Sequence, residues 1–412
     1  MNVVQVTPSV VHPPKTGSER RSHGLVSQFP SNGGSVVRFC QRSRGMPSLR
    51  RYEREVELAE SYVEIRHASP LGELTRVVSK LGYPSFVFLG DEIRHRTPDR
   101  LRELVERADV VLVEEFWQVS AVKELAVGTP VVYSTQSVGT DYLDGVAGKP
   151  FGEWFLDRAR HVERAAIASA DAIVCEHAAD ERELRDSFGA TGPVFVVPNA
   201  VRADEVRDST EPSAAGRRIR ETYGIGPGVM VGLFVGSATD FNADAAERLV
   251  ETAGRLEARG ADIEILLVGS VGEAVDATFD NVHAPGYVED LEAYYDAADI
   301  GLNPLTWGTT PTGSNIKMIE YLSRGLPVVS TPYGASGYDL TDGENVVVAD
   351  DEGFTDAVVD LCADEARRRE LSRNALEHVW ENHVWETVSS RFYRQLEGLL
   401  AEREEQLSVS DD

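Results

Sequence analysis

The chain alternates short apolar runs with helix-length amphipathic stretches, and this alternation limits the folds it can adopt. The first series of runs is β-branched or aromatic and stops at polar or turn residues, at 3–6, 86–89, 109–113, 130–133, 172–175 and 194–197. Helical patterns lie between several of these runs, as at 98–107 and 151–169. Strands that alternate with helices form parallel βαβ units whose sheets are covered on both faces. The sequence therefore predicts an α/β fold.

The alternation restarts after residue 229. Apolar runs at 230–236 and 263–269 both end in glycine, with a helical pattern at 243–259, and further strands are predicted at 300–304, 327–330 and 346–348. A chain of 412 residues exceeds the roughly 250–300 that one core sustains. The Pro- and Gly-containing segment 199–228 is interpreted as the inter-domain segment. Two doubly wound domains are expected to face a cleft, because ligands bind beyond the carboxyl ends of parallel strands.

The charge balance excludes some classes of partner. Lys plus Arg number 41 and Asp plus Glu number 68, which gives a net charge of −27, and only five residues are lysine. Such a surface argues against a general nucleic-acid binder, which needs Lys and Arg for the phosphate backbone. An acidic, Lys-poor composition resembles that of proteins from salt-accumulating halophiles, including haloarchaea. The alternative is an ordinary acidic cytosolic protein.

Cysteine usage and hydropathy indicate the compartment. The three cysteines are an odd number without a CxxC pair, so they indicate neither a disulfide framework nor a zinc site. The sequence has no apolar run of about 18 residues, and its start lacks the features of a signal peptide. We expect a cytoplasmic protein, with peripheral contact at the inner face of the membrane left open.

The segment 15–54 runs against the global charge. It holds nine cationic residues against two acidic ones: Lys15, Arg20, Arg21, Arg38, Arg42, Arg44, Arg50, Arg51 and Arg54 against Glu19 and Glu53. One hypothesis is a basic lip that meets an anionic lipid-phosphate acceptor or the headgroup surface. The alternative is a solvated arginine-rich face.

The most informative stretch for chemistry is 313–329. A small polar segment leads into a helix that carries Lys317 and Glu320 one turn apart, with Ser314 as a plausible N-cap. The free N–H groups of a first helical turn bind anions, and Lys317 adds a full charge close to them. A sugar–nucleotide diphosphate needs both, because charge builds on its leaving oxygens. Glu320 could accept hydrogen bonds from a ribose diol. The alternative is a capped surface helix with an ordinary Lys–Glu pair.

With this stretch, the chain resembles glycosyltransferase family 4 of the GT-B fold over nearly its whole length. The residues that carry the resemblance are 234–237, 267–270, 286–291, 298–304 and 313–329, with 131–135 and 197–201 in the N-terminal half. The resemblance implies an α/β GT-B architecture of two doubly wound, Rossmann-like parallel-sheet domains. It implies an acceptor domain over 1–205, a nucleotide-sugar donor domain over 206–383, a helix over 384–405 that crosses back to the first domain, and an acidic tail over 406–412.

The resemblance also implies residue roles. Lys317 and Glu320 are implied as catalytic, with Glu320 on the donor ribose. The implied donor-binding set is Gly236, Ser237, Gly269, Tyr287, Val288, Thr312, Gly313, Ser314, Asn315, Lys317 and Glu320. On the acceptor side it is Lys15, Gly17 and Gln136. The fold implies no metal or other cofactor, since the nucleotide-sugar is a co-substrate, and the sequence has no Asp-x-Asp triplet.

The chain departs from the family pattern at three places. Thr312 stands where a first glutamate usually contacts the transferred sugar, and Gln136 stands where histidine is common. No basic residue occurs in 237–242, where many members carry a basic pair. Lys317 is therefore expected to carry the diphosphate charge.

These observations favour a metal-independent, retaining glycosyltransferase that moves a sugar from a nucleotide diphosphate to a hydroxyl acceptor, either a glycan or a lipid-linked one. The alternatives are a non-catalytic GT-B partner protein, which would explain Thr312 and Gln136, a nucleotide-sugar epimerase and a two-domain small-molecule binding protein.

Overall fold

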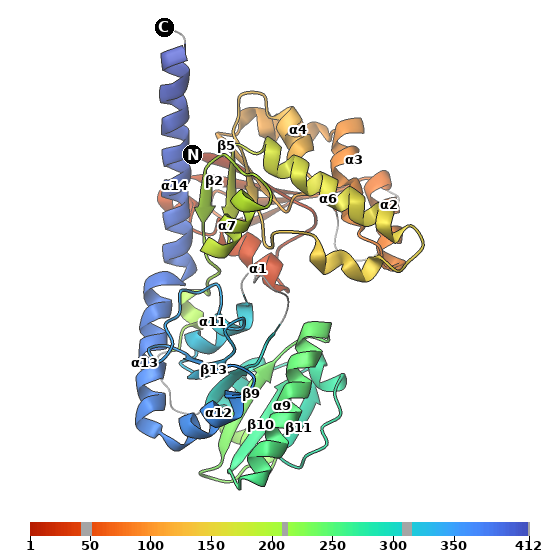
Figure 1. Ribbon diagram of the computed structural model, residues 1–412. Helices are drawn as coiled ribbons and strands as arrows, with labels where there is room; N and C mark the ends of the chain where they lie inside the picture. The colour runs from red at the N-terminus through yellow and green to blue at the C-terminus, as the bar shows by residue number, and fades with distance from the viewer. Residues whose placement is uncertain (43–51, 208–212, 307–314, 411–412) are drawn as a thin grey trace. The chain divides into compact units, whose positions relative to one another are not determined.

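The chain forms two compact α/β units. The computed structural model describes residues 1–42, 52–207, 213–306 and 315–410. Unit 1 consists of Met1–Pro198 together with Trp385–Asp412, and unit 2 consists of Asn199–Val384. Figure 1 shows the ribbon of both units, coloured along the chain from red at the N-terminus to blue at the C-terminus. Within the described residues, no helix is both long enough and apolar enough to cross a bilayer.

The strands of the two units follow the chain in order. Unit 1 contains β1 (Asn2–Thr7), β2 (Ser35–Cys40), β3 (Tyr52–Ala59), β4 (Tyr62–Ala68), β5 (Val110–Glu114), β6 (Val131–Ser134), β7 (Ala172–Cys175) and β8 (Val194–Val196). Unit 2 contains β9 (Met230–Val235), β10 (Ile263–Val268), β11 (Val282–Gly286), β12 (Ile300–Asn303), β13 (Val328–Ser330) and β14 (Val347–Val348).

Helices connect these strands. Unit 1 holds α1 (Gly17–Gly24), α2 (Pro70–Lys80), α3 (Leu89–His95), α4 (Asp99–Arg107), α5 (Val119–Leu125), α6 (Gly152–Ser169), α7 (Ala178–Asp186) and α14 (Trp385–Ser410). Unit 2 holds α8 (Ala214–Thr222), α9 (Asp240–Ala258), α10 (Leu291–Ala297), α11 (Ile316–Ser323), α12 (Phe354–Ala363) and α13 (Glu365–Asn382). Segment 199–228 therefore contributes a helix to unit 2, where Gly216 lies close against the backbone of Asp296.

Each sheet has one point at which the strand order reverses. The order in unit 1 is β3-β4-β2-β1-β5-β6-β7-β8, and the reversal lies between β1 and β5. The order in unit 2 is β11-β10-β9-β12-β13-β14, and the reversal lies between β9 and β12. All described pairings are parallel except β3 with β4, which is antiparallel at the sheet edge. Ligands of open α/β sheets bind at such reversals, so these two edges are where the sites are sought.

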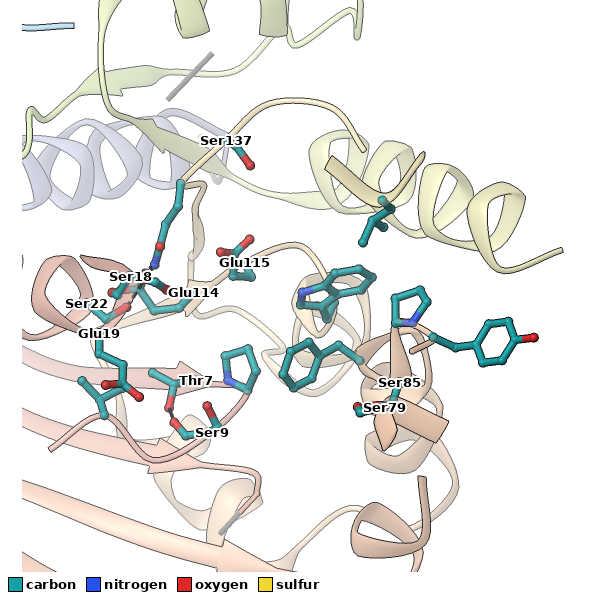
Figure 2. Close-up of a pocket in the computed structure, with 18 residues that line it drawn as sticks. Thr7, Ser9, Ser18, Glu19, Ser22, Ser79, Ser85, Glu114, Glu115 and Ser137 are labelled. Carbon is teal, nitrogen blue, oxygen red and sulfur yellow. Dashed lines mark hydrogen bonds between the residues drawn. The ribbon is translucent and has the colours of Figure 1, made fainter. Parts of the chain in front are cut away.

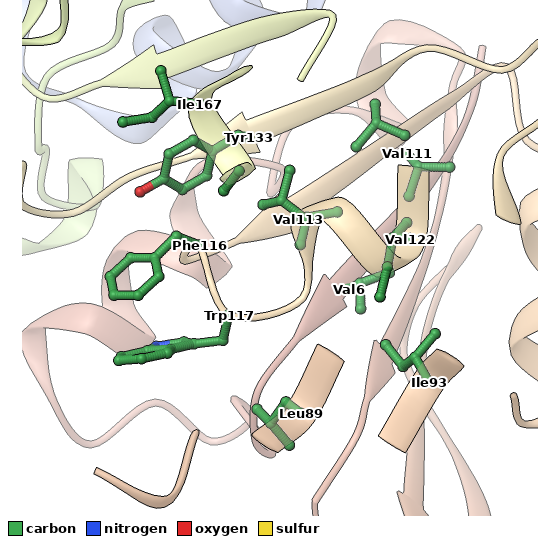
Figure 3. Packing of buried hydrophobic residues seen from close by; sticks show 14 of the residues in the cluster. Val6, Leu89, Ile93, Val111, Val113, Phe116, Trp117, Val122, Tyr133 and Ile167 are labelled. Atoms are coloured by element: carbon green, nitrogen blue, oxygen red, sulfur yellow. The ribbon is translucent and has the colours of Figure 1, made fainter. Parts of the chain in front are cut away.

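The core of unit 1 lies between the sheet and its helices. Inward residues of β1, β5 and β6 pack against α3, α5 and α6, including Val6, Val113 and Ile93. Figure 3 shows Phe116 and Trp117 close together beyond the end of β5, below Tyr133. Their ring centroids are 3.9 Å apart. This aromatic pair fixes the loop that follows β5.

The expected strand at 86–89 is wrong. Residues Ser85–Phe88 form a 3-10 helix, η2, and α3 continues from Leu89. Pro84 precedes the turn, and acidic residues in the first turn of α3 favour the helix. Val87 and Leu89 are buried, whereas the ring of Phe86 packs on Trp117. An apolar run of four residues does not distinguish a buried strand from a buried helical turn.

The C-terminal helix is longer than expected. Helix α14 spans Trp385–Ser410, so the expected acidic tail that begins at 406 is helical up to Ser410. Trp385 packs against Gly24, and the Oγ of Ser389 donates a hydrogen bond to the carbonyl of Leu25 at 2.9 Å. The ring of Phe392 lies 5.8 Å from that of Phe29. These contacts join the last helix to the first segment of unit 1.

Candidate functional site

At the reversal edge of unit 2, the loops that follow β9 and β10 approach each other closely. Gly236 follows β9 and Gly269 follows β10, and these strands pair in register from Met230 to Val235. Gly269 has φ of +97°, and a Cβ there would lie 2.3 Å from the carbonyl oxygen of Gly236. Only glycine fits that conformation and that approach. The two glycines therefore let the two loops meet closely at this edge.

Lys317 is held at this edge by side chains from two elements. It stands in the first turn of α11, and its ammonium donates a hydrogen bond to Oδ1 of Asn242 in α9 at 2.6 Å. The Nδ2 of Asn242 donates to the carbonyl of Ser237 at 3.0 Å. The ammonium also lies 4.7 Å from the ring centroid of Phe234, at the end of β9. Lys317, Asn242 and the loop after β9 thus form one connected group.

The surroundings of Lys317 lower its affinity for a proton. Burial lowers the pKa of Lys317 to about 7, and the carboxylate of Glu320 opposes that shift. Because the pKa of this half-buried amine lies near neutrality, an anionic neighbour would stabilise its charged form. The edge therefore favours an anionic ligand electrostatically.

Glu320 lies one turn further along α11. Its Oε2 accepts a hydrogen bond from the hydroxyl of Tyr295 at 2.9 Å. Tyr295 is buried, and burial together with Glu320 raises its pKa well above the ordinary value. The guanidinium of Arg324 lies 4.2 Å from the Tyr295 ring centroid and pairs with Glu292. Tyr295 therefore stays a neutral donor that orients Glu320.

The remaining predicted donor residues are distributed unevenly. Tyr287 is 77% exposed, and Val288 packs against the core between β11 and α10. Asn315 is the N-cap of α11, which corrects the expectation of Ser314 in that role. Its Nδ2 donates to Oδ1 of buried Asn303 at 3.2 Å, so its side chain does not cap the helix. Thr312, Gly313 and Ser314 lie outside the described residues.

The reversal edge of unit 1 holds a cavity of about 550 Å³. Figure 2 shows Ser18 and Ser22 of α1 on one side and Ser79 and Ser85 on the opposite side. The loop after β1 and the end of β5 also contribute. The lining residues are Thr7, Pro8, Ser9, Val11, Ser18, Glu19, Ser22, Ser79, Tyr83, Pro84, Ser85, Phe86, Glu114, Glu115, Trp117, Gln136, Ser137 and Leu143. Hydroxyls, aromatic rings and carboxyl groups thus line the same cavity.

Of the predicted acceptor-side residues, the structure brings Gln136 into this cavity. Its Nε2 donates to Oγ of Ser22 at 3.2 Å and to the carbonyl of Ser18 at 3.3 Å, both on α1. Gly17 begins α1, and the Lys15 side chain is exposed. Neither Lys15 nor Gly17 lines the cavity.

The acidic pair Glu114 and Glu115 at the end of β5 was missed by the sequence reasoning. Glu114 is 1% exposed, and its Oε1 accepts a hydrogen bond from Nε2 of Gln5 at 2.6 Å. Glu115 has φ of +65°, a conformation unusual for a residue with a Cβ and frequent at functional sites. Burial and the carboxylates of Glu114, Glu176 and Glu163 raise the pKa of Glu115 to about 8, against a lowering by Arg21. Two acidic residues directly after a buried strand were the available signal.

The arginine-rich segment is partly internal. Arg21, Arg38 and Arg42 are buried rather than presented as a solvated lip. Arg38 donates through Nε to Oε1 of Gln5 at 2.8 Å and pairs with Glu64 at 3.2 Å. Arg20, Arg54 and Lys15 are exposed, whereas Arg44, Arg50 and Arg51 lie outside the described residues.

No cluster of three or more His, Cys, Asp or Glu side chains suited to a metal ion occurs in the described parts of either unit.

Comparison with known proteins identifies related sequences. Residues 230–364 match the family described as glycosyl transferases group 1, and residues 16–200 match the glycosyl transferase 4-like domain. The chain is 27% identical over 259 residues to D-inositol 3-phosphate glycosyltransferase of Geodermatophilus obscurus. That alignment covers 57% of this chain and 55% of the relative, so the match spans about half of the relative's length.

Solved structures share the architecture. Sucrose-phosphate synthase from Thermosynechococcus elongatus has a TM-score of 0.69 at 17% identity, covering 98% of this chain and 100% of that one. Anabaena HepE in complex with UDP has a TM-score of 0.65 at 12% identity, covering 97% and 100%. At these identities the likeness concerns the fold.

Proposed function

The chain belongs to the glycosyl transferases group 1 family and has the GT-B fold, and from that premise we propose that it is a glycosyltransferase using a nucleotide-diphosphate sugar. Unit 2 would bind the donor and unit 1 the acceptor. The observation that carries the proposal is the hydrogen bond between Lys317 and Asn242 at the reversal edge of unit 2. The relative from Geodermatophilus is named as a glycosyltransferase, and HepE binds UDP, which support the same class of donor.

The chemistry follows from where charge develops. As the bond between the sugar C1 and the diphosphate oxygen breaks, negative charge grows on that oxygen, and Lys317 would stabilise it. The acceptor hydroxyl forms the new bond to C1, and its proton passes to the departing diphosphate. We propose retention of configuration with the acceptor on the same face, which fits Gln136 in place of a basic imidazole. Glu320, oriented by Tyr295, would hold the ribose hydroxyls.

We also propose that the reaction needs no divalent metal. The support is the placement of a cation, Lys317, within the first turn of α11, where backbone N–H groups add to its charge. A turnover assay with and without EDTA tests this, and turnover that disappears with the chelator and returns with Mg²⁺ would contradict it.

A binding screen followed by a transfer assay tests the function. Calorimetry with UDP, GDP, ADP and dTDP, and then with their sugars, should give one nucleotide that binds at micromolar to millimolar dissociation constants. The matching sugar nucleotide should be hydrolysed slowly without an acceptor and faster with one. A protein that binds the nucleotide but neither hydrolyses nor transfers the sugar would be a non-catalytic partner. Conversion of the sugar without any acceptor would indicate an epimerase.

A further inference from the structure

The cavity of unit 1 has a lining chemistry that limits its ligand. Its walls carry the hydroxyls of Ser9, Ser22 and Ser137, the rings of Trp117 and Phe86, and the carboxyl groups of three glutamates, Glu19, Glu114 and Glu115. None of the lining residues in the described part of the chain is Lys, Arg or His. Figure 2 shows the carboxyl group of Glu115 between the α1 serines and Ser85.

Three cations of unit 1, one of which bonds to the lining residue Ser85, are already engaged by protein groups. Arg21 pairs with Glu176 at 3.4 Å, and both side chains are buried. Arg42 donates through Nη1 to Oγ of Ser85 at 2.9 Å. Lys149 donates to the carbonyl of Gly82 at 2.9 Å. None of the three lines the cavity, so a phosphate group entering it would lose water without gaining a cation.

We propose that this cavity binds the acceptor as an uncharged, hydroxyl-rich ring, a sugar or cyclitol without phosphate, and that Glu115 determines this selectivity. The inference rests on the proposed transferase function and names its acceptor class. Serine hydroxyls and carboxyl groups match the donors and acceptors of ring hydroxyls, and Trp117 and Phe86 offer apolar surface to C–H faces.

The state of Glu115 supports this match. Its carboxyl makes no hydrogen bond with the described residues, and its backbone N–H donates to the carbonyl of Ser134 at 2.9 Å. Its pKa is raised to about 8, so near pH 7 it is largely protonated and can donate as well as accept a hydrogen bond. The charged groups that act on it are Glu114, Glu176, Glu163 and Arg21. Above pH 8 it becomes an anion and repels phosphate further.

Direct binding to the full chain tests the proposal without a donor. The probes are glucose against glucose 6-phosphate, and myo-inositol against D-inositol 3-phosphate, by calorimetry at pH 7 and pH 9. At pH 7 we expect at least one neutral probe to bind roughly tenfold or more tightly than its phosphorylated counterpart. The ratio of the two affinities should grow severalfold at pH 9. Both phosphates are dianions at both pH values, because their second pKa is about 6.

Two substitutions separate the role of Glu115 from packing. Glu115→Gln keeps the shape and hydrogen bonding but cannot ionise, so the growth of the ratio at pH 9 should disappear. Glu115→Leu should weaken neutral-probe binding by about tenfold. Glu106→Gln, at an exposed position of α4, is the matched control and should change neither. Circular dichroism establishes that each variant is folded.

Three results would overturn the proposal. The phosphorylated probes could bind as tightly as the neutral ones or more tightly, or none of the four probes could bind. Both Glu115 variants could also keep the unsubstituted protein's ratio of neutral-probe to phosphorylated-probe affinity at both pH values. Calorimetry with nucleotide diphosphates on the same preparation reports separately on the donor side. Nucleotide binding and transfer to a phosphorylated acceptor would uphold the transferase function and overturn only the acceptor class. Neutral-probe binding without nucleotide binding would instead overturn the transferase.

Discussion

The ammonium of Lys317 donates a hydrogen bond to Oδ1 of Asn242 at 2.6 Å, which ties the first turn of α11 to the first turn of α9. The two residues are 75 positions apart in the chain and meet where the strand order of unit 2 reverses. Because Asn242 also bonds to Ser237, the lysine is connected to the loop after β9. This group is the centre of the proposed diphosphate site.

Replacing Lys317 should reduce turnover more than it raises KM. Leaving-group charge grows in the transition state, so the lost interaction is worth more there than in the ground state. Lys317→Met should lower the rate by about 10²–10³, and Lys317→Arg should recover part of it. Release of nucleotide diphosphate at saturating acceptor measures this. A folded Lys317→Met protein with full turnover would place the diphosphate elsewhere.

Donor affinity should fall as the pH rises above 7. Burial lowers the pKa of Lys317 to about 7, so above that pH the free protein must take up a proton to pair an ammonium with the diphosphate. The dissociation constant should rise by up to about tenfold per pH unit between 7 and 9. Calorimetry in buffers of different ionisation enthalpy measures both affinity and proton uptake.

Lys317→Arg is the control for this pH dependence, because arginine stays charged over the whole range. Its affinity should be flat from pH 7 to 9. An equally steep dependence in this variant would assign the titration to another group.

Glu320→Gln should weaken binding of the cognate nucleotide diphosphate by about 1.5–3 kcal/mol, the range for hydrogen bonds to a charged group. In the structure, Oε2 of Glu320 already accepts one hydrogen bond from the hydroxyl of Tyr295, which orients the carboxylate. Calorimetry measures the change. Glu370→Gln, at a surface ion pair with Arg367 in the same unit, should have no effect on binding. An unchanged dissociation constant in Glu320→Gln would make this glutamate a structural partner of Tyr295 alone.

Gly269→Ala should destabilise unit 2 and disturb the proposed donor edge. The positive φ strains any Cβ, and this Cβ would also press on the Gly236 carbonyl, so a loss of about 2–5 kcal/mol is expected. Gly224→Ala has φ of +69° with open space around the Cβ and should cost about 1–2 kcal/mol. Urea unfolding of both variants gives the comparison. Equal losses of unfolding free energy in the two variants would mean that the backbone moves to relieve the contact between the new Cβ and Gly236 at no cost.

Low salt should unfold the chain if its acidic surface is adapted to concentrated salt. With a net charge of −27, self-repulsion is unscreened in dilute buffer. Circular dichroism from about 0.1 M to multi-molar KCl should show folding gained with salt, because the screening length shrinks from about 10 Å to 3 Å by 1 M. Full folding with unchanged stability at the lowest salt would refute the adaptation.

Periodicity predicted the two-sheet α/β architecture because central strands such as β9 are continuous apolar runs. It missed β2 and β4 because charged residues interrupt them. Arg38 in β2 and Glu64 in β4 are both fully buried and neutralise each other across the sheet. It also missed β11, whose sequence contains His283 and Pro285. A buried ion pair cannot be recognised from one strand alone, since each charge looks like solvent exposure.

The group of side chains at the reversal edge of unit 2, the proposed donor site, could be read from the sequence only in part. Lys317 and Glu320 were identified from their place on one helix, but their partners Asn242 and Tyr295 come from other elements. The acidic pair after β5 was overlooked for a different reason. A carboxylate at a strand end resembles any turn residue until neighbouring segments close a cavity around it. In this chain those segments are residues 7–9 at the end of β1, residues 18–22 of helix α1 and residues 136–137.

The packing of α14 has a consequence for synthesis. Trp385, Ser389 and Phe392 complete the surface around Gly24, Leu25 and Phe29, although more than 350 residues separate the two segments. A ribosome delivers the N-terminal segment first, whereas its partner helix emerges after all of unit 2. The part of unit 1 that is translated first therefore holds an uncovered apolar face until α14 has emerged, and this is the interval in which a nascent chain would need a chaperone.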